Sequence, residues 1–96
     1  MTSIISNLNK AFESRIRLGI MSILSVNASA DFNALKELLE ITDGNLASHL
    51  KALESAQYIQ SMKQFIGRKP NTKYKITELG RKNFDEHLNA LEKLLK

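Results

Sequence analysis

The stretch that decides the fold is Thr42–Tyr58, which reads TDGNLASHLKALESAQY. Leu46, Leu50 and Leu53 recur there at the spacing i, i+4, i+7, so they share one face of a helix. Thr42 can cap the first turn, because its hydroxyl oxygen accepts a backbone N–H. We therefore predict a helix that begins at Thr42 and buries a leucine seam.

The face opposite the leucines carries short, polar or uncharged side chains, namely Asn45, Ser48, His49 and Ala52. Most exposed helix faces are filled with Glu and Lys. Small hydrogen-bonding side chains suit a helix that lies in a DNA major groove, and Gly44 lets the backbone come close to another surface. An ordinary surface helix with few charges fits the same pattern, and the residues that follow decide between the two.

A β-hairpin is predicted directly after this helix. Ile59–Ile66 reads as a strand of imperfect alternation, and Thr72–Thr77 alternates cleanly. Gly67–Asn71, with the letters GRKPN, has the Gly, Pro and Asn residues of a turn. The hairpin therefore has a basic tip.

Two helices are predicted upstream. One runs from about Ile5 to Ser25, and Gly19 within it predicts close contact with another helix. Asp31 and Phe32 read as a very short extended piece, and Asn33 is the expected cap of a second helix, Ala34–Glu40. Two short helices joined by a tight connection, the later one with a small polar face, are typical of a helix-turn-helix.

A last helix is predicted over about residues 78–95, with Thr77 as its cap and Glu78 in its first turn. Its expected apolar stripe is Leu79, Phe84, Leu88, Leu91 and Leu95. This is more apolar surface than one small core absorbs, so we expect a symmetry-related partner helix. The predicted homodimer interface, formed by the first and last helices, consists of Ile5, Leu8, Phe12, Phe84, Leu88, Leu91 and Leu95.

The predicted order is α-β-α-α-β-β-α. This is a mainly α structure with a small β-hairpin (α+β), arranged as a winged helix-turn-helix in one domain over residues 1–96. The six aromatic residues are scattered singly, so we expect them in the core or an interface and not as a base-stacking surface; they are Phe12, Phe32, Phe65, Phe84, Tyr58 and Tyr74.

Composition narrows the function classes. The formal net charge is +4, which suits a polyanionic partner, and there are no cysteines for disulfides, thiolate metal sites or nucleophiles. No apolar run approaches the roughly 20 residues that span a bilayer, and the N-terminus lacks signal-peptide features. We expect a cytoplasmic protein without a membrane association.

No phosphate loop, nucleophile elbow or metal-ligand set is present in the sequence, so we expect neither an enzyme nor a cofactor or metal.

Three stretches in their order carry a resemblance: RIRLGIMSIL at 15–24, TDGNLASHLKALESAQYI at 42–59 and FIGRKPNTKYKITELGR at 65–81. Together they resemble the winged-helix transcriptional regulators related to the MarR and ArsR groups. More narrowly, they resemble a small stand-alone family with TDGNL-x-x-HL, GRKP, T-x-Y and LT-x-x-GR motifs. The resemblance implies a homodimeric DNA-binding regulator whose third helix enters the major groove and whose wing reaches the backbone or minor groove.

Carried over by position, the DNA-facing residues implied by the resemblance are Thr42, Gly44, Asn45, Ser48 and His49 on the helix and Arg68 and Lys69 on the wing. Lys51 and Lys73 are further candidates for backbone contact. For His49, a hydrogen bond within the helix bundle is the alternative. Arg17 is a candidate for phosphate contact or for pairing with Glu13.

Two departures from the family pattern affect the expectations. Asn71 stands where a basic wing residue is expected, which predicts a lower wing affinity. The metal-sensing branch uses cysteine ligands, which this chain lacks, so that mode of regulation is not inherited.

The sequence therefore predicts a homodimeric transcriptional regulator that binds a pseudo-palindrome in double-stranded DNA and that we expect to act as a repressor. A winged-helix protein-interaction module is the alternative. A ligand-gated switch with a cavity at the dimer interface is a further one, and the sequence identifies no effector.

Overall fold

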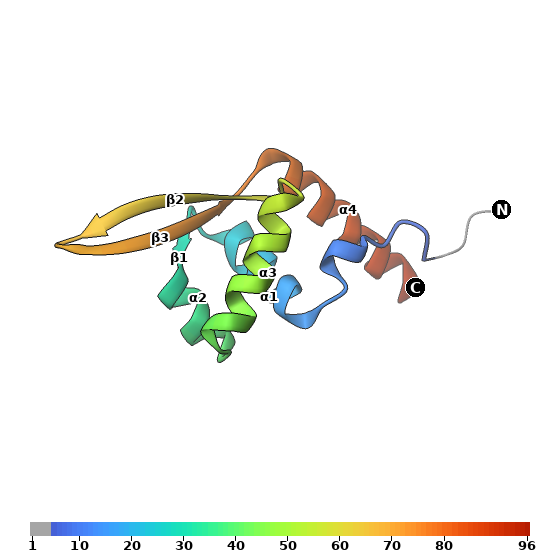
Figure 1. Ribbon diagram of the computed structural model, residues 1–96. Helices are drawn as coiled ribbons and strands as arrows, with labels where there is room; N and C mark the ends of the chain where they lie inside the picture. Colours follow the sequence, from blue (N-terminus) through green and yellow to red (C-terminus); the bar gives the residue numbers. More distant parts are fainter. Residues whose placement is uncertain (1–4) are drawn as a thin grey trace.

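The computed structural model describes residues 5–96 and has the predicted order of helices and strands, preceded by one short 3-10 helix (Figure 1). The elements are η1 (Lys10–Phe12), α1 (Arg15–Val26), β1 (Ala30–Asp31), α2 (Phe32–Leu39), α3 (Asp43–Ser55), β2 (Ile59–Ile66), β3 (Lys69–Ile76) and α4 (Glu78–Leu94). The predicted winged helix-turn-helix, an α+β fold, is confirmed.

The sheet is antiparallel with the strand order β1-β3-β2. Strand β1 is only two residues long and pairs with β3 at Tyr74 and Lys73. The β2–β3 pairing is much longer, and it runs from Ile59 opposite Ile76 to Ile66 opposite Lys69. The outer part of the hairpin therefore has no third strand beside it and projects from the body as a wing (Figure 1).

The leucine seam of α3 lies in the core as predicted: Leu46, Leu50 and Leu53 are buried. Other fully buried residues come from α1, α2 and α4. The close helix contact predicted from Gly19 is confirmed. A Cβ at Gly19 would lie 2.6 Å from Leu39 Cδ2, so α1 and α2 meet at that point. These contacts hold α3 against the bundle with its opposite face outward.

The predicted first helix from about residue 5 to residue 25 is wrong in its first half. Helix α1 begins at Arg15, because Ser14 has an extended backbone and its hydroxyl accepts the Arg17 N–H at 3.3 Å. The residues before Ser14 form turns and η1, and the Asn9 side chain caps η1 by accepting the Ala11 N–H at 2.9 Å. Two polar caps therefore interrupt what the apolar spacing suggests is one helix.

The helix cap predicted at Asn33 is also wrong. Helix α2 begins at Phe32, and its cap is Asp31, whose carboxylate accepts the Ala34 N–H at 2.7 Å. Asp31 is at the same time the second residue of β1. Strand and helix thus follow one another without a connecting loop.

The turn of the wing is shorter than predicted. Only Gly67 and Arg68 lie between the strands, and Gly67 has φ +64°, a conformation that glycine adopts without steric cost. Pro70 therefore lies in β3, opposite Phe65. Pro70 lacks a backbone N–H, and β3 tolerates it because no strand pairs with its other side at that position.

The apolar stripe predicted for α4 is divided between the core and the surface of the protomer. Phe84 is buried and Leu91 is half-buried, but Leu79, Leu88 and Leu95 are exposed. The buried face consists of Gly80, Phe84, His87 and Ala90. The helix is rotated toward this face because Gly80 packs directly on the backbone of Tyr58: a Cβ there would lie 2.0 Å from the Tyr58 carbonyl oxygen.

Candidate nucleic-acid interface

The first turn of α3 is exposed and capped. The Thr42 hydroxyl accepts the Asn45 N–H at 3.2 Å, as the sequence predicts. Thr42, Gly44, Asn45 and Ser48 are all exposed, so the four small or polar residues predicted to face DNA lie on the open side of the helix. Lys51 is exposed one turn further along. Two more small residues of this helix, Ala47 and Ser55, are exposed and were not among the predicted site residues.

Gly44 is not required by contacts within the protomer. A Cβ at this position would meet nothing within 4 Å, and its φ is not in the left-handed region. Glycine destabilises a helix relative to alanine. A glycine that no internal contact explains is consistent with a molecule outside the protomer that approaches this backbone closely.

Both acidic side chains of α3 are bound by other residues of the protomer. The Asp43 carboxylate forms an ion pair with Lys36 of α2 at 2.7 Å, and the Glu54 carboxylate accepts a hydrogen bond from the Ser61 hydroxyl of β2. The ion pair is largely exposed, so it contributes little stability. The pair offsets the one negative charge in the first turn of α3.

His49 is half-buried and bonded within the helix bundle, which was the alternative expectation for this residue. Its Nδ1 atom accepts a hydrogen bond from the Arg17 Nε of α1 at 3.0 Å. Burial, and secondarily the positive charge of Arg17, lower the pKa of the His49 imidazole. His49 therefore orients Arg17 toward α3, and no bond between Arg17 and Glu13 occurs in the described part of the chain.

The wing holds the excess positive charge of the protein. The hairpin from Ile59 to Ile76 contains five of the 14 Lys and Arg residues and none of the 10 Asp and Glu residues. The rest of the chain therefore has nine basic and ten acidic residues, a net charge of −1. The basic character that suits a polyanionic partner is thus concentrated in one projecting element.

Arg68 and Lys69 lie exposed at the tip of the wing, as predicted. Asn71, where a basic residue was expected, is hydrogen-bonded across the hairpin: the Gln64 Nε2 donates to Asn71 Oδ1 at 2.8 Å. Lys73 does not reach the tip. It lies half-buried at the base of the wing, opposite Asp31 of β1, so it is not brought together with Arg68 and Lys69.

The tip also carries two apolar side chains that the sequence analysis did not assign to the interface. Phe65 was expected in the core or an interface, but it is 74% exposed and lies outside the core, and Ile66 is 58% exposed. One signal was available in the sequence. Two large apolar residues that adjoin in a strand point to opposite faces, and a thin hairpin cannot bury both.

The residues predicted for a dimer interface fall into two groups. Phe12 and Phe84 are buried inside the protomer, where their ring centroids lie 5.4 Å apart, so little of either side chain is left for a partner. Ile5, Leu88 and Leu95 are exposed, whereas Leu8 and Leu91 are half-buried. The exposed leucines lie along α4, on the side of the molecule away from the wing tip (Figure 1).

His87 joins the N-terminal segment to α4. Its side chain is only 4% exposed, and its Nδ1 accepts the Asn9 backbone N–H at 2.9 Å. The Asn9 side chain also donates to the Tyr58 hydroxyl at 3.0 Å. Burial lowers the pKa of His87, against a smaller opposing effect of Glu13. His87 is therefore a neutral structural residue.

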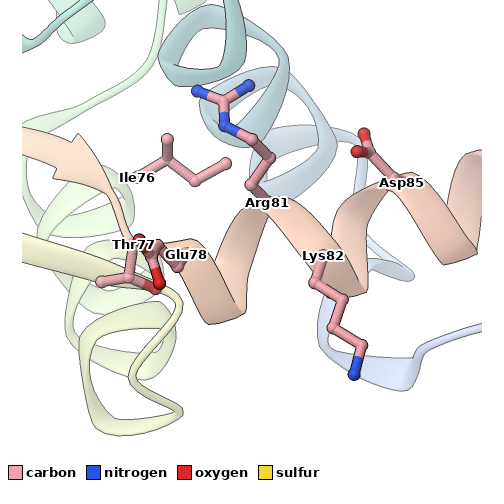
Figure 2. A pocket seen from close by; sticks show the side chains of 6 residues that line it. All are labelled: Ile76, Thr77, Glu78, Arg81, Lys82 and Asp85. Carbon is pink, nitrogen blue, oxygen red and sulfur yellow. The ribbon is translucent and has the colours of Figure 1, made fainter.

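A shallow pocket lies where β3 meets α4, and Figure 2 shows the side chains that line it. Arg81 and Lys82 point in opposite directions there, and Arg81 donates to the Ser25 carbonyl oxygen at 3.2 Å. The charged groups do not converge on one point, so we assign no ligand to this pocket.

Within residues 5–96, no cluster of three or more His, Cys, Asp or Glu side chains is placed to hold a metal ion. None of the helices in that range has the length and apolar character needed to cross a membrane.

The chain is similar to several proteins of known sequence or structure. It is 38% identical over 87 residues to an uncharacterized protein of Methanocaldococcus jannaschii, covering 91% of this chain and 95% of that protein. The solved structure of a transcriptional regulator homologue from Pyrococcus horikoshii OT3 matches with a TM-score of 0.82 at 30% identity, covering 88% of this chain and 84% of the other. The transcriptional regulator BldR from Sulfolobus solfataricus shares the fold, with a TM-score of 0.72 at 18% identity over 96% of this chain and 68% of its own.

A family model described as a winged helix DNA-binding domain matches residues 16–95, which include α3 and the whole wing. The exposed first turn of α3 and the basic hairpin thus lie within the matched region. The family is one of DNA-binding domains, in keeping with the expectation of a regulator and not an enzyme. The chain belongs to the winged-helix DNA-binding domain family.

Proposed function

We propose that this protein is a homodimeric transcriptional repressor that binds a pseudo-palindromic site in duplex DNA. The observation that carries the proposal is the combination of an exposed first turn of α3, whose one acidic residue Asp43 is paired with Lys36, and a wing that holds the excess positive charge. Such a division separates the contacts that read bases from those that position the protein on phosphates. A DNA-binding regulator of this kind would act in the cytoplasm.

In this proposal α3 enters the major groove. Asn45 can bond in bidentate fashion to adenine, and Ser48 can bond to either type of base. The exposed N–H groups of the first turn, next to Gly44, favour a phosphate. Lys51 is placed to reach the backbone, whereas His49 contributes through Arg17.

In the same proposal Arg68 and Lys69 contact phosphates beside the groove. Both side chains are exposed at the end of a hairpin, whose Gln64–Asn71 bond ties the two strands together below the tip. Lys73 lies at the base of the wing and would add charge without direct contact. Wing affinity would therefore depend on the two tip residues.

The proposed dimer uses the face of α4 that the protomer leaves open. Leu88 and Leu95, the latter 87% exposed, lie on that face beside the half-buried Leu91. Ile5 and Leu8 would extend the interface from the N-terminal segment. A two-fold axis there would present two α3 helices to half-sites about 34 Å apart, one turn of the double helix.

The proposed function is tested by the salt dependence of binding to a mixed-sequence duplex. Wild type is compared with Arg68→Ala/Lys69→Ala and with Lys82→Ala/Lys93→Ala, which removes the same charge from α4. Each neutralised phosphate contributes roughly −0.9 to the slope of log K against log salt. The wing variant is expected to flatten the slope by about 1.8 and the α4 variant to leave it unchanged. Absence of binding by the wild type at low salt would favour a protein-interaction module instead.

The dimer is tested separately by sedimentation of Leu88→Ser/Leu95→Ser. Both side chains are exposed in the protomer, so the variant should fold but sediment as a monomer. Its footprint on a selected site should shrink from two symmetrical halves to one. A wild type that sediments as a monomer and protects one unsymmetrical half-site would contradict the dimer and leave DNA binding intact.

A further inference from the structure

The end of the wing bears apolar side chains that no part of the described protomer covers. Phe65 is 74% exposed and Ile66 is 58% exposed, and Pro70 is exposed as well. None of the three belongs to the core or to the residues packed around it. A scattered surface leucine needs no explanation, but three apolar residues at one hairpin end do.

The register of the hairpin places these side chains on both of its faces. Phe65 is directly opposite Pro70, so the two share one face with their Cβ atoms about 5 Å apart. Ile66 is opposite Lys69 on the other face. Only the Gly67–Arg68 turn lies beyond them. The projecting end of the hairpin therefore carries apolar side chains on both of its faces.

The charge of the hairpin end indicates which kind of partner would contact it. Arg68 and Lys69 adjoin the apolar residues, and the hairpin contains no Asp or Glu. The tip of a second copy would carry the same positive charge and repel it. A duplex has the complementary chemistry, because it offers phosphates to the basic residues and the faces of stacked bases to the apolar ones.

We propose that the wing tip is an apolar wedge, in which Phe65, supported by Pro70, enters a base step from the minor groove and kinks the DNA. Arg68 and Lys69 hold the flanking phosphates. Phe, Ile and Pro are among the side chains that minor-groove proteins insert between bases, with kinks of about 20–90°. This inference rests on the proposed function and adds DNA bending to it. The protein would then prefer DNA sites that have a flexible base step at the position of the wing, because such a step is easier to kink. This preference adds specificity without hydrogen bonds to bases.

The experiment measures binding and stiffness on the same long mixed-sequence duplex, so no operator needs to be known. The probes are fluorescence anisotropy for bound protein and single-molecule stretching for the apparent persistence length, which is about 50 nm for free DNA. Wild type is compared with Phe65→Ser and with Leu38→Ser, a control that changes an apolar residue of α2 that is 66% exposed. Thermal unfolding of both variants is expected to match the wild type because both side chains are exposed.

The wild type and Leu38→Ser are expected to lower the persistence length to below about 35 nm at saturation. Phe65→Ser is expected to bind about tenfold more weakly, with the same salt slope, and to leave the DNA near its free stiffness when equally occupied. Binding by the wild type without softening, or equal softening by Phe65→Ser, would overturn the wedge and keep the proposed function. A Phe65→Ser variant that alters only self-association would place a second copy on the tip and also overturn it. No binding by the wild type would overturn both proposals.

Discussion

The first turns of α3 and α4 are built alike and differ in their surroundings. In each, a threonine hydroxyl caps the helix, from Thr42 to the Asn45 N–H at 3.2 Å and from Thr77 to the Gly80 N–H at 2.9 Å. An acidic residue follows each threonine, and each turn contains a glycine. A Cβ at Gly44 would meet open space, whereas a Cβ at Gly80 would lie 2.0 Å from the Tyr58 carbonyl oxygen.

The difference shows how one local pattern serves two purposes. At α4 the glycine is required by the fold, because the helix backbone packs on the end of the α3–β2 connection. At α3 a Cβ at Gly44 would touch nothing in the protomer, which leaves this part of the turn available to a molecule from outside. Substitutions at matched positions of the two turns would test this contrast.

The largest effect is expected for Gly80→Ala. The added methyl group would overlap a backbone oxygen that cannot rotate away, so helix and turn must separate. We expect a loss of about 3 kcal/mol or more in the free energy of unfolding, measured by urea denaturation. A loss below about 0.5 kcal/mol would mean that α4 does not pack tightly against Tyr58.

The next effect concerns the two caps. The Thr77 hydroxyl accepts the Gly80 N–H and also donates to the Gln57 carbonyl oxygen at 2.7 Å, whereas Thr42 makes the cap bond alone. We expect Thr77→Ala to cost about 2 kcal/mol and Thr42→Ala about 1 kcal/mol in thermal unfolding. DNA affinity should respond in the opposite order. Equal losses of stability would show that the bond to Gln57 adds nothing.

A smaller effect of opposite sign is expected for Gly44→Ala. Alanine favours the helix, and the new methyl group meets nothing within the protomer, so stability should rise by about 0.5 kcal/mol. Binding to duplex DNA should weaken at least about tenfold if the backbone approaches DNA closely. A variant that is more stable and binds equally well would show that Gly44 is not at the DNA surface.

The smallest effect is a dependence on pH, and it contrasts the two histidines. Both pKa values are lowered in the folded chain, so the unfolded chain takes up protons first as the pH falls below about 6.5. Stability should therefore decrease from about pH 7 toward the folded pKa values and then level off. Because His87 is buried and accepts the Asn9 N–H, His87→Gln should remove more of this decrease than His49→Gln. Identical curves for wild type and His87→Gln would contradict this.

The parts of the fold that could be predicted from the sequence are those that short stretches of neighbouring residues determine by themselves. The leucine seam of α3, the caps at Thr42 and Thr77 and the basic hairpin were all identified correctly. The errors occur where long-range contacts decide. Ser14 interrupts an apolar spacing, and the packing of Gly80 on Tyr58 puts Gly80, and not Leu79 of the predicted stripe, on the buried face of α4.

The candidate interface was predictable to a similar degree. Residue type and order place Thr42, Gly44, Asn45 and Ser48 on the open side of α3, because helical spacing separates them from the leucines. The bond between His49 and Arg17 joins residues far apart in the chain, and no spacing rule reveals it. Phe65 was expected in the core or an interface. The adjacent Ile66 was the one sequence signal that a thin hairpin could not bury both side chains, and the length of the hairpin beyond β1 shows how exposed Phe65 is.

The most direct test of the contrast between α3 and α4 is the map of backbone amide shifts when duplex DNA is added to the 10.8 kDa protein. Two-dimensional nitrogen–proton spectra would resolve each amide at that size. We predict that perturbations concentrate at residues 42–48 and at residues 65–69 of the wing tip, since Pro70 has no amide proton, while the amide signals of residues 78–84 in the first turns of α4 stay unchanged. Perturbations confined to α4 and the N-terminal segment, with α3 and the wing tip unchanged, would contradict it.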